Sequence, residues 1–464
     1  MSPLELKPTG VDEHQYLERL EAAPLYRPSG KVQKSVGMIF EAHLPGARVG
    51  SLCRIEADRL AGSPVVHAEV IGFKDKRVLL MPFDDATGIN NDSRVRLAQE
   101  SSAVMVGEAL LGRVLDARGN PIDGKGPLFS NPELEGEWRT LYQKPSHPLE
   151  REVIRKPLDL GVRAINALLT CGRGQRVGIM AGSGVGKSVL LGMMARHTAA
   201  DINVIALIGE RGREVREFIE RDLGPEGLGR SVVIVATSDQ SPLLRMRGAF
   251  LASTVAEYFR DQKKDVLLMM DSVTRFCMAQ REIGLSMGEP PASKGYTPSV
   301  FATLPKLLER AGTGIGGGSI TGLFTVLVEG DDMDDPIADS ARSILDGHIV
   351  LSRKIAQRNH FPAIDVLQSA SRVMRSVISP DHLNWSGQIR EWMATYQQVE
   401  DLLNLGAYQK GSNPKIDTSI LVHERINQLL RQGIEDSASL PETLAMMQSI
   451  VLTAQGESAN FAGS

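Results

Sequence analysis

The sequence predicts an α/β protein whose core is preceded by a small β-barrel and followed by a helical domain. Short β-rich runs fill residues 31–98, buried-strand patterns alternate with helical stretches from about residue 161 to 378, and strand patterns stop beyond residue 379. We therefore divide the chain into residues 1–30, a helical segment; 31–98, the barrel; 99–378, the core with the linker that leads into it; and 379–464, the helical domain.

The barrel is predicted from residues 65–73 and 77–81, two apolar runs bounded by Pro, Gly and Asp-Asp. Upstream, Tyr16, Leu17 and Leu20 fall on one face of a possible helix. Downstream, residues 120–157 are rich in Pro, Gly and charge, so we expect mostly connecting structure there.

The core is predicted from apolar strands that alternate with helices. The predicted strands are 177–180, 204–209 and 266–270, and the predicted helices are 189–197, 215–221 and 254–263. This alternation is typical of a parallel sheet covered by helices. In the last domain, helical periodicity at 388–405 and 418–433 is interrupted by Asn413-Pro414.

Composition places the chain among ordinary globular proteins. Its 464 residues, 42% hydrophobic and 23% charged, are enough for two or three domains. The polar N-terminus and the lack of an apolar run of about 18 residues lead us to expect a cytosolic protein. Cys53, Cys171 and Cys277 are scattered, which favours reduced thiols over a disulfide framework or zinc site. A net charge of −4 without a basic run gives little support for nucleic-acid binding.

The most specific motif is Ala-Gly-Ser-Gly-Val-Gly-Lys-Ser at residues 181–188, between a predicted strand and a predicted helix. In such a loop the glycines let backbone N–H groups surround phosphates, the lysine neutralises phosphate charge, and the hydroxyl can hold Mg²⁺. Ala181 stands where glycine is usual, but the motif still predicts ATP or GTP binding. The predicted nucleotide-binding residues are Gly182, Ser183, Gly184, Val185, Gly186, Lys187 and Ser188.

Two acidic residues close predicted strands downstream of this loop. Asp271 ends the run 266–270, where an acid usually supports Mg²⁺, and Glu210 follows the run 204–209. We expect Ser188 and Asp271 at the metal and Glu210 in the catalytic role. The residues alone leave open that Glu210 and Arg211 are only a solvated strand end.

Taken together, the motifs resemble those of the type III secretion ATPases, which are related to the catalytic subunits of rotary ATP synthases. The matching segments are 181–188, Gly-Glu-Arg-Gly-Arg-Glu at 209–214, Asp-Ser-Val-Thr-Arg-Phe at 271–276, Gly-Glu-Pro-Pro-Ala-Ser-Lys-Gly-Tyr at 288–296 and Ser-Ile-Leu-Asp-Gly-His at 343–348. Leu-Leu-Met-Pro-Phe at 79–83 and Gly-Ala-Tyr-Gln-Lys-Gly-Ser at 406–412 more closely resemble the flagellar export ATPases. The resemblance implies a RecA-like P-loop core.

The resemblance also implies roles for single residues. Glu210 would polarise the attacking water, with Lys187, Arg211 and Asp271 in the same catalytic set. Arg372, in Ser-Ala-Ser-Arg at 369–372, would be an arginine finger that reaches the neighbouring subunit's ATP. Phe361 would stack on adenine, where tyrosine is more usual; a plain core phenylalanine is the alternative. Arg275 would lie in the active-site turn after Asp271.

Several partners follow from the same resemblance. The chain would form a homohexamer, and the loop at 284–295 would contact a central, stalk-like coiled-coil protein, unless it is only stiffened for packing. The N-terminal segment would bind a peripheral-stalk-like regulator, or dock on its own barrel. Export chaperones, their cargo and a membrane export gate complete the expected partners, without nucleic acid. The protein would be cytoplasmic and peripherally associated with an inner-membrane export apparatus.

The expected function is a Mg²⁺-dependent ATPase that energises flagellar protein export by releasing substrates from chaperones and unfolding them. A rotary ATP synthase catalytic subunit would share Lys187, Glu210 and Asp271. It would also carry an acidic lever segment in its C-terminal helices, and the C-terminal sequence here shows no such segment. A hexameric RNA translocase would need stacking aromatics in the barrel, where only Phe40, Phe73 and Phe83 occur. A non-catalytic nucleotide-binding ring subunit is the third alternative, and Glu210 argues against it.

Overall fold

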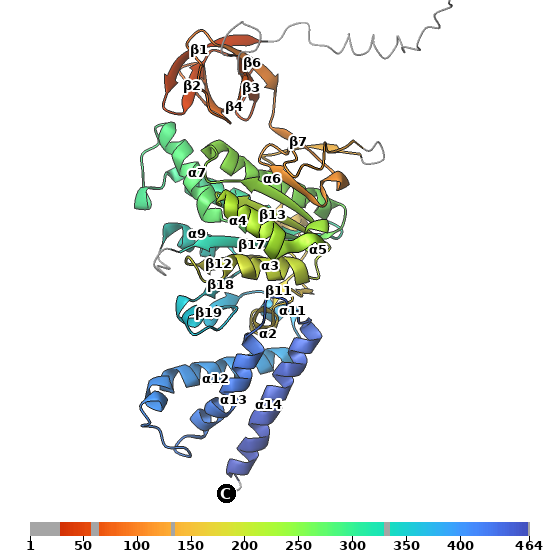
Figure 1. The fold of residues 1–464 in the computed structure, drawn as a ribbon, viewed down its shortest axis with the longest axis vertical. Coiled ribbons are helices and arrows are strands. Elements are labelled where there is room, and N and C mark those ends of the chain that lie inside the picture. Colours follow the sequence, from red (N-terminus) through yellow and green to blue (C-terminus); the bar gives the residue numbers. More distant parts are fainter. Residues whose placement is uncertain (1–27, 57–64, 131–134, 329–334, 463–464) are drawn as a thin grey trace, which may run out of the picture. The chain divides into compact units, whose positions relative to one another are not determined.

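The computed structural model describes residues 28–56, 65–130, 135–328 and 335–462. They belong to two compact units, Met1–Ser102 and Ala103–Ser464, which we describe separately (Figure 1). The predicted helical face of Tyr16, Leu17 and Leu20 lies outside the described residues.

The first unit is a closed antiparallel barrel, as predicted. Its strands are β1 (Ser29–Val36), β2 (Ile39–Ala42), β3 (Leu52–Glu56), β4 (Val65–Lys74), β5 (Arg77–Pro82) and β6 (Arg94–Gln99), in the order β1-β2-β5-β4-β3-β6. Inward positions alternate along β4, where Val66, Ala68 and Val70 are buried in the barrel core. Because the barrel is closed, each of these six strands pairs with two neighbours.

The second unit is built on a large, mostly parallel sheet. Its strands are β8 (Arg113–Asp116), β12 (Arg176–Ala181), β13 (Ile202–Ile208), β14 (Ser231–Ala236), β15 (Asp265–Asp271), β16 (Gly312–Thr313), β17 (Ser319–Leu327), β18 (Gly347–Leu351) and β19 (Ile364–Ser371). The order is β19-β18-β12-β17-β15-β13-β14-β8, with β16 paired to β17. All pairs are parallel except β18 with β19 and β16 with β17. The carboxyl ends of the parallel strands therefore share one edge.

Helices cover this sheet, as the alternating pattern predicts. They are α2 (Arg163–Leu168), α3 (Lys187–His197), α4 (Gly212–Glu217) with the π-helical turn η3 (Phe218–Leu223), α5 (Gly224–Gly229), α6 (Pro242–Asp261), α7 (Val273–Ser286), α8 (Pro298–Leu308), α9 (Pro336–Ile344) and α10 (Arg353–Gln357). The helix predicted at 254–263 is the second half of α6, which begins at Pro242 because Ser241 caps its first turn.

The segment predicted as connecting structure contains few elements. The short elements of the second unit are β7 (Ala103–Val106), η1 (Glu108–Leu110), β9 (Glu137–Thr140), η2 (Pro148–Glu150), β10 (Pro157–Leu158), β11 (Cys171–Gly172), η4 (Ser293–Gly295) and α11 (Met374–Val377). Strand β9 pairs with β7, and β10 pairs with β11.

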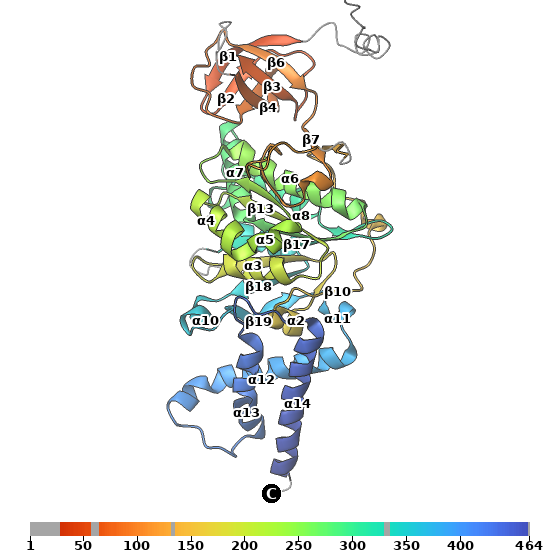
Figure 2. The same ribbon diagram turned by 45° about the vertical axis from the view of Figure 1, so that its right-hand side comes forward.

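Three long helices end the chain: α12 (Pro380–Asn404), α13 (Pro414–Leu430) and α14 (Leu440–Ala462) (Figure 2). Ser379 and Asn413 cap α12 and α13, each followed by proline at the first helical position, which explains why Asn413-Pro414 separates them. The sequence reasoning did not identify α14 as a separate helix. Among the described residues, no helix is long and apolar enough to span a bilayer.

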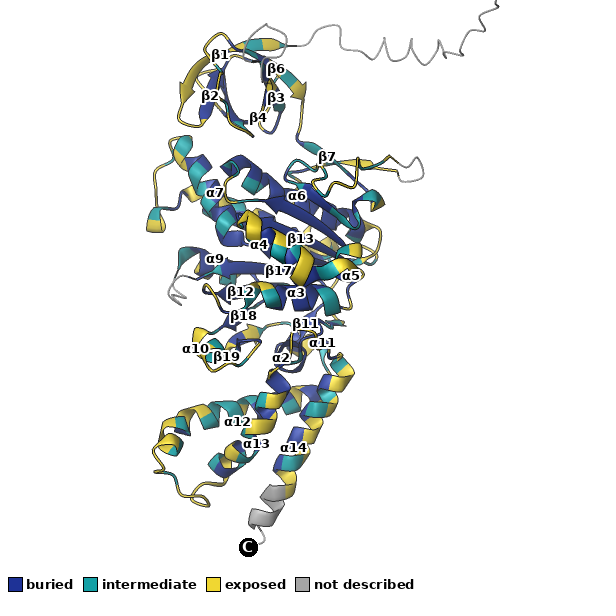
Figure 3. Ribbon diagram, in the orientation of Figure 1, coloured by how far each residue is buried: buried dark blue, intermediate teal, exposed yellow. Residues whose placement is uncertain are grey.

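The terminal helices share one hydrophobic core with the sheet. Ile389, Val422 and Met447 belong to the same buried cluster as Val177 and Ile179 of β12. Figure 3 shows the central strands buried except at some of their ends, whereas α12, α13 and the described part of α14 bury one side and expose the other. The junction where β12 ends and α3 begins is therefore part of a core to which both the sheet and the terminal helices contribute.

Candidate active site

The glycine-rich loop joins the buried end of β12 to the first turn of α3. Gly184 and Gly186 have φ of 75° and 84°, the left-handed region that glycine adopts without strain. Val185 is buried between them and anchors the loop. Ser188 is exposed on the first helical turn. A glycine turn followed by the N-terminus of an eleven-residue helix is a geometry that suits a phosphate chain.

Lys187, Glu210 and Asp271 meet beside this loop. The Lys187 ammonium lies 2.5 Å from Oδ1 of Asp271 and 3.4 Å from Oε1 of Glu210. The two carboxylates come together because β13 and β15 are neighbours, with Leu207 in register with Asp271. The structure thus brings together three of the residues that the sequence singled out.

Burial and mutual charge set the protonation of this cluster. Burial lowers the pKa of Lys187, but the charges of Asp271 and Glu210 outweigh burial, so its pKa is raised overall. Burial and the negative charge of Asp271 raise the pKa of Glu210 to about 7, against the opposing effect of Lys187. Glu210 therefore exchanges its proton close to neutral pH.

A further residue of the cluster, Thr325 in β17, was not identified from the sequence. Its hydroxyl donates to Oδ1 of Asp271 at 2.7 Å, and the residue is fully buried. This strand carries three hydroxyl side chains, Ser319, Thr321 and Thr325, and the sequence does not distinguish Thr325 from the others because buried threonines usually bond the nearest backbone.

Arg275 lies against the strand end that carries Glu210. A Cβ placed on Gly209, whose φ is 72°, would lie 2.7 Å from Cβ of Arg275, so this close approach requires glycine. Ser272 caps α7 by accepting from the Arg275 backbone N–H at 3.3 Å. The turn after Asp271 therefore holds Arg275 beside Gly209 and Glu210.

Arg211 is not brought into the cluster. Its side chain is 78% exposed and pairs with Glu214 at 3.1 Å on the outside of α4. The catalytic role assigned to Arg211 from the resemblance remains a prediction.

Phe361 lies next to the glycine-rich loop. It is 41% exposed, and two of its ring carbons would lie 3.6 Å from a Cβ placed on Gly186. Its backbone carbonyl accepts from the Gln432 N–H at 2.9 Å. The buried Gln432 amide in turn accepts from Arg163 N–H at 2.9 Å and donates to Gly161 O at 2.8 Å. Gln432, which the sequence reasoning missed, thus ties the end of α13 to Phe361.

Arg372 lies at the opposite edge of the sheet from the loop. It follows β19, which is antiparallel to β18, and its N–H donates to Asp346 O at 3.0 Å. Asp346 also pairs with Arg176 at the start of β12, five residues before Ala181. At about 3.3 Å per strand residue, the start of the loop lies about 16 Å from Arg176, whose partner Asp346 is bonded to Arg372. Arg372 is exposed, with Nη2 3.3 Å from Arg342 O, and does not meet Lys187 of its own chain.

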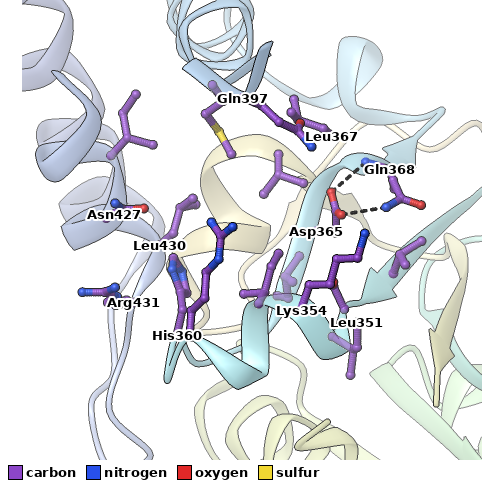
Figure 4. Close-up of a pocket in the computed structure, with 18 of the residues that line it drawn as sticks. Leu351, Lys354, His360, Asp365, Leu367, Gln368, Gln397, Asn427, Leu430 and Arg431 are labelled. Carbon is purple, nitrogen blue, oxygen red and sulfur yellow. Dashed lines mark hydrogen bonds between the residues drawn. The ribbon is translucent and has the colours of Figure 1, made fainter. Parts of the chain in front are cut away.

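A cavity of about 550 Å³ lies beside the beginning of the loop. Its walls come from Met180 to Gly182, α10, β19, α12 and α13. Figure 4 shows His360 near Asn427 and Arg431 on one side of it, and Lys354 near Asp365 on the other, where Asp365 is bound by Gln368. Burial, with the nearby Arg431 and His423, lowers the pKa of His360 to about 4. The cavity reaches Gly182 of the glycine-rich loop, but its lining does not include Lys187, Glu210, Asp271 or Phe361.

Hard oxygen donors are available for a divalent cation. Ser188 and Asp271 provide a hydroxyl and a carboxylate, the ligand types that Mg²⁺ prefers when phosphates and water complete its shell. Within the described ranges, no group of three or more His, Cys, Asp or Glu side chains is placed to hold a metal by itself. The donor set therefore fits a cation that arrives with a nucleotide.

Fold and site together define a P-loop nucleotide-binding protein with a parallel sheet, a barrel unit and a helical end. The profile of the ATP synthase alpha/beta family, nucleotide-binding domain, matches residues 161–371. The beta-barrel domain of the same family matches residues 32–97. The T3SS EscN ATPase C-terminal domain matches residues 378–449, which favours the secretion ATPases over the rotary synthase subunits.

Similar proteins cover nearly the whole chain. The flagellum-specific ATP synthase of Bacillus subtilis (strain 168) is 51% identical over 435 residues, 94% of this chain and 98% of that protein. The assembled ATPase EscN of the enteropathogenic E. coli type III secretion system has a TM-score of 0.84 at 46% identity, covering 91% of this chain and 100% of that one. EscN in complex with its central stalk EscO has a TM-score of 0.83, with the same identity and coverage. The chain belongs to the family of flagellum-specific ATP synthases and type III secretion ATPases.

Proposed function

We propose that this protein hydrolyses ATP with Mg²⁺ and couples hydrolysis to the export of flagellar proteins by a type III system. Membership of the family of flagellum-specific ATP synthases and type III secretion ATPases supports both the reaction and the process. Among the alternatives, a non-catalytic ring subunit is disfavoured because Glu210 is present next to the phosphate loop. The observation that carries the proposal is the cluster of Lys187, Glu210 and Asp271 at the start of α3.

In the proposed mechanism, the residues 182–188 surround the phosphates through backbone N–H groups, and Lys187 moves from the two carboxylates to the phosphate oxygens. Ser188 and Asp271 would hold Mg²⁺, which would neutralise phosphate charge. Glu210, once ionised, accepts a hydrogen bond from the attacking water and orients it. Its raised pKa suits this role, because a general base works best with a pKa near the working pH. Phe361 stacks on the adenine.

The arginine finger is proposed to act between subunits. Arg372 is exposed and lies across the sheet from its own loop, so within one chain it cannot reach the phosphates. In a homohexamer it would face the ATP of the neighbouring subunit, where its planar fork can neutralise charge on phosphate oxygens. The assembled state of EscN supports this arrangement.

Partners are proposed on the same basis. The loop at 284–295 exposes Leu285 and Met287 and would contact a central coiled-coil stalk, as the EscN complex with EscO suggests. Residues 1–30 would bind a peripheral-stalk-like regulator. Export chaperones and cargo would meet the ring at a membrane export gate, where the protein would act from the cytoplasm and release and unfold its substrates.

The proposal is tested by comparing wild-type protein with Lys187→Ala. Because the variant loses the cation that holds the phosphates, we expect weaker nucleotide binding and a loss of turnover of at least about 10²-fold. Both are measured on purified protein, by calorimetry and by phosphate release. Complementation of swimming in a bacterium that lacks its own flagellar export ATPase then tests the export function. Unchanged affinity in the variant would contradict the role of Lys187, and active enzyme that fails in every complementation would contradict flagellar export.

A further inference from the structure

Oδ1 of Asp271 is contacted by two groups, one charged and one neutral. The Lys187 ammonium lies 2.5 Å from it and the Thr325 hydroxyl 2.7 Å from it. None of the described residues is hydrogen-bonded to the other oxygen, Oδ2. Lys187 sits on the first turn of a helix, whereas Thr325 is fixed in the middle of the sheet.

Thr325 occupies a position where a hydroxyl is costly. It is fully buried in β17, in register with Ile179 of β12, and every other residue of β17 except the last is buried as well. A buried hydroxyl without a partner destabilises a protein, so the Thr325 hydroxyl needs an acceptor. Among the described residues its other acceptor is Met270 O, which is uncharged and lies further away, at 3.2 Å. Since the hydroxyl has one proton, the carboxylate is the favoured acceptor.

The proposed reaction requires Lys187 to leave Asp271 for the phosphates. Asp271 is 4% exposed, and its buried carboxylate would then lose its contact with Lys187. Thr325 stays in place, because β17 is held between β12 and β15. Among the described side chains, Thr325 is thus the one whose hydrogen bond to Asp271 can persist when Lys187 moves. This bond can keep the carboxylate in the same orientation before and after the move.

We propose that Thr325 is a positioning residue that keeps Asp271 oriented for Mg²⁺ once Lys187 has transferred to the nucleotide. This inference rests on the proposed role of Asp271 at the metal. Thr325 does not touch substrate, and its effect should appear in the dependence of nucleotide binding on Mg²⁺ rather than in binding without the metal.

The test compares Thr325→Val, which keeps the shape and removes the hydroxyl, with Thr325→Ser, which keeps the hydroxyl. The matched control is Thr321→Val on the same strand, where the hydroxyl is equally buried but accepts from Gly174 N–H at 2.9 Å, away from the site. Affinity for the non-hydrolysed analogue adenylyl imidodiphosphate is measured by calorimetry with Mg²⁺ and with EDTA. If valine at 325 prevents folding, alanine at 325 and 321 forms the matched pair.

We expect Thr325→Val to reduce the Mg²⁺-dependent gain in affinity by at least about tenfold, the size of one charge-assisted hydrogen bond. Affinity in EDTA should stay at the wild-type value, and Thr325→Ser and Thr321→Val should behave as wild type. A wild-type gain in Thr325→Val, or an equal loss in Thr321→Val, would overturn the inference. Asp271→Asn distinguishes failure of the inference about Thr325 from failure of the proposed metal site. If Asp271→Asn retains the full Mg²⁺-dependent gain in affinity, the proposed role of Asp271 itself is wrong.

Discussion

Glu210 is the residue on which the proposed chemistry depends most, and its environment predicts the pH dependence of the reaction. Its pKa is raised to about 7 in the nucleotide-free protein, and only the ionised carboxylate can accept a proton from water. We therefore expect kcat/KM, which reports the free enzyme, to fall tenfold per pH unit below about pH 7. The measurement is initial rates of phosphate release from pH 5.5 to 8.5.

Glu210→Gln keeps the size and hydrogen bonding of the side chain but cannot ionise. ATP should still bind, while hydrolysis falls by at least about 10²-fold and the acidic limb near pH 7 disappears. Glu217→Gln, on the exposed side of α4 and paired with Arg213, is the matched control and should change neither property. Near-wild-type turnover in Glu210→Gln would remove Glu210 from the mechanism.

At the scale of elements, a buried ion pair joins α6 to the end of α8. Arg310 is fully buried and binds both oxygens of Glu257 in α6, at 2.7 and 2.6 Å. It also donates to Leu141 O at 2.7 Å, after β9. Arg310 therefore connects the segment after β9 to α6 and to the end of α8.

Replacing Arg310 by methionine should destabilise the protein by about 3–5 kcal/mol, because Glu257 would remain as an unpaired buried charge. Urea unfolding followed by circular dichroism measures the loss, and Arg310→Met combined with Glu257→Met should recover a large part of it. The exposed pair of Arg216 and Glu220, at 2.7 Å, serves as the control: Arg216→Met should cost less than about 1 kcal/mol. Equal costs for the two single variants would show that burial does not decide the strength of these pairs.

The elements differ in how far the sequence predicts them. The strands β12, β13 and β15 and the loop between β12 and α3 follow from apolar runs and glycine spacing, because these are local properties. The role of Thr325, the Gln432 contact with Phe361 and the Arg310 pair do not, since each joins segments far apart in the chain. Helix α14 was missed as a separate element although the sequence marks its start, where Ser439 and Glu442 form a capping box. Arg211 shows the converse: a motif position that the fold turns away from the cluster.

At the scale of the whole molecule, one chain holds two halves of the proposed site on opposite edges of its sheet. The loop with Lys187 and Glu210 lies at the carboxyl ends of the strands, and Arg372 lies near the start of β12 and β18. A ring in which each subunit presents Arg372 to its neighbour would complete every site. Activity should then rise more steeply than in proportion to protein concentration, as subunits assemble.

Mixing two inactive variants tests this arrangement directly. Arg372→Ala keeps its own loop but presents a defective edge, and Glu210→Gln has the reverse defect, so neither alone should hydrolyse ATP well. In mixed rings, some interfaces join an intact Glu210 to an intact Arg372, and in an equal mixture about a quarter of them should do so if subunits mix at random. Phosphate release by the mixture should therefore recover to about a quarter of the wild-type rate. A mixture of Lys187→Ala and Glu210→Gln should stay inactive, because both variants are defective on the side of the interface that carries the loop. If the first mixture also stays inactive although rings are seen by electron microscopy, or if the specific rate does not change down to monomer, Arg372 does not act between subunits.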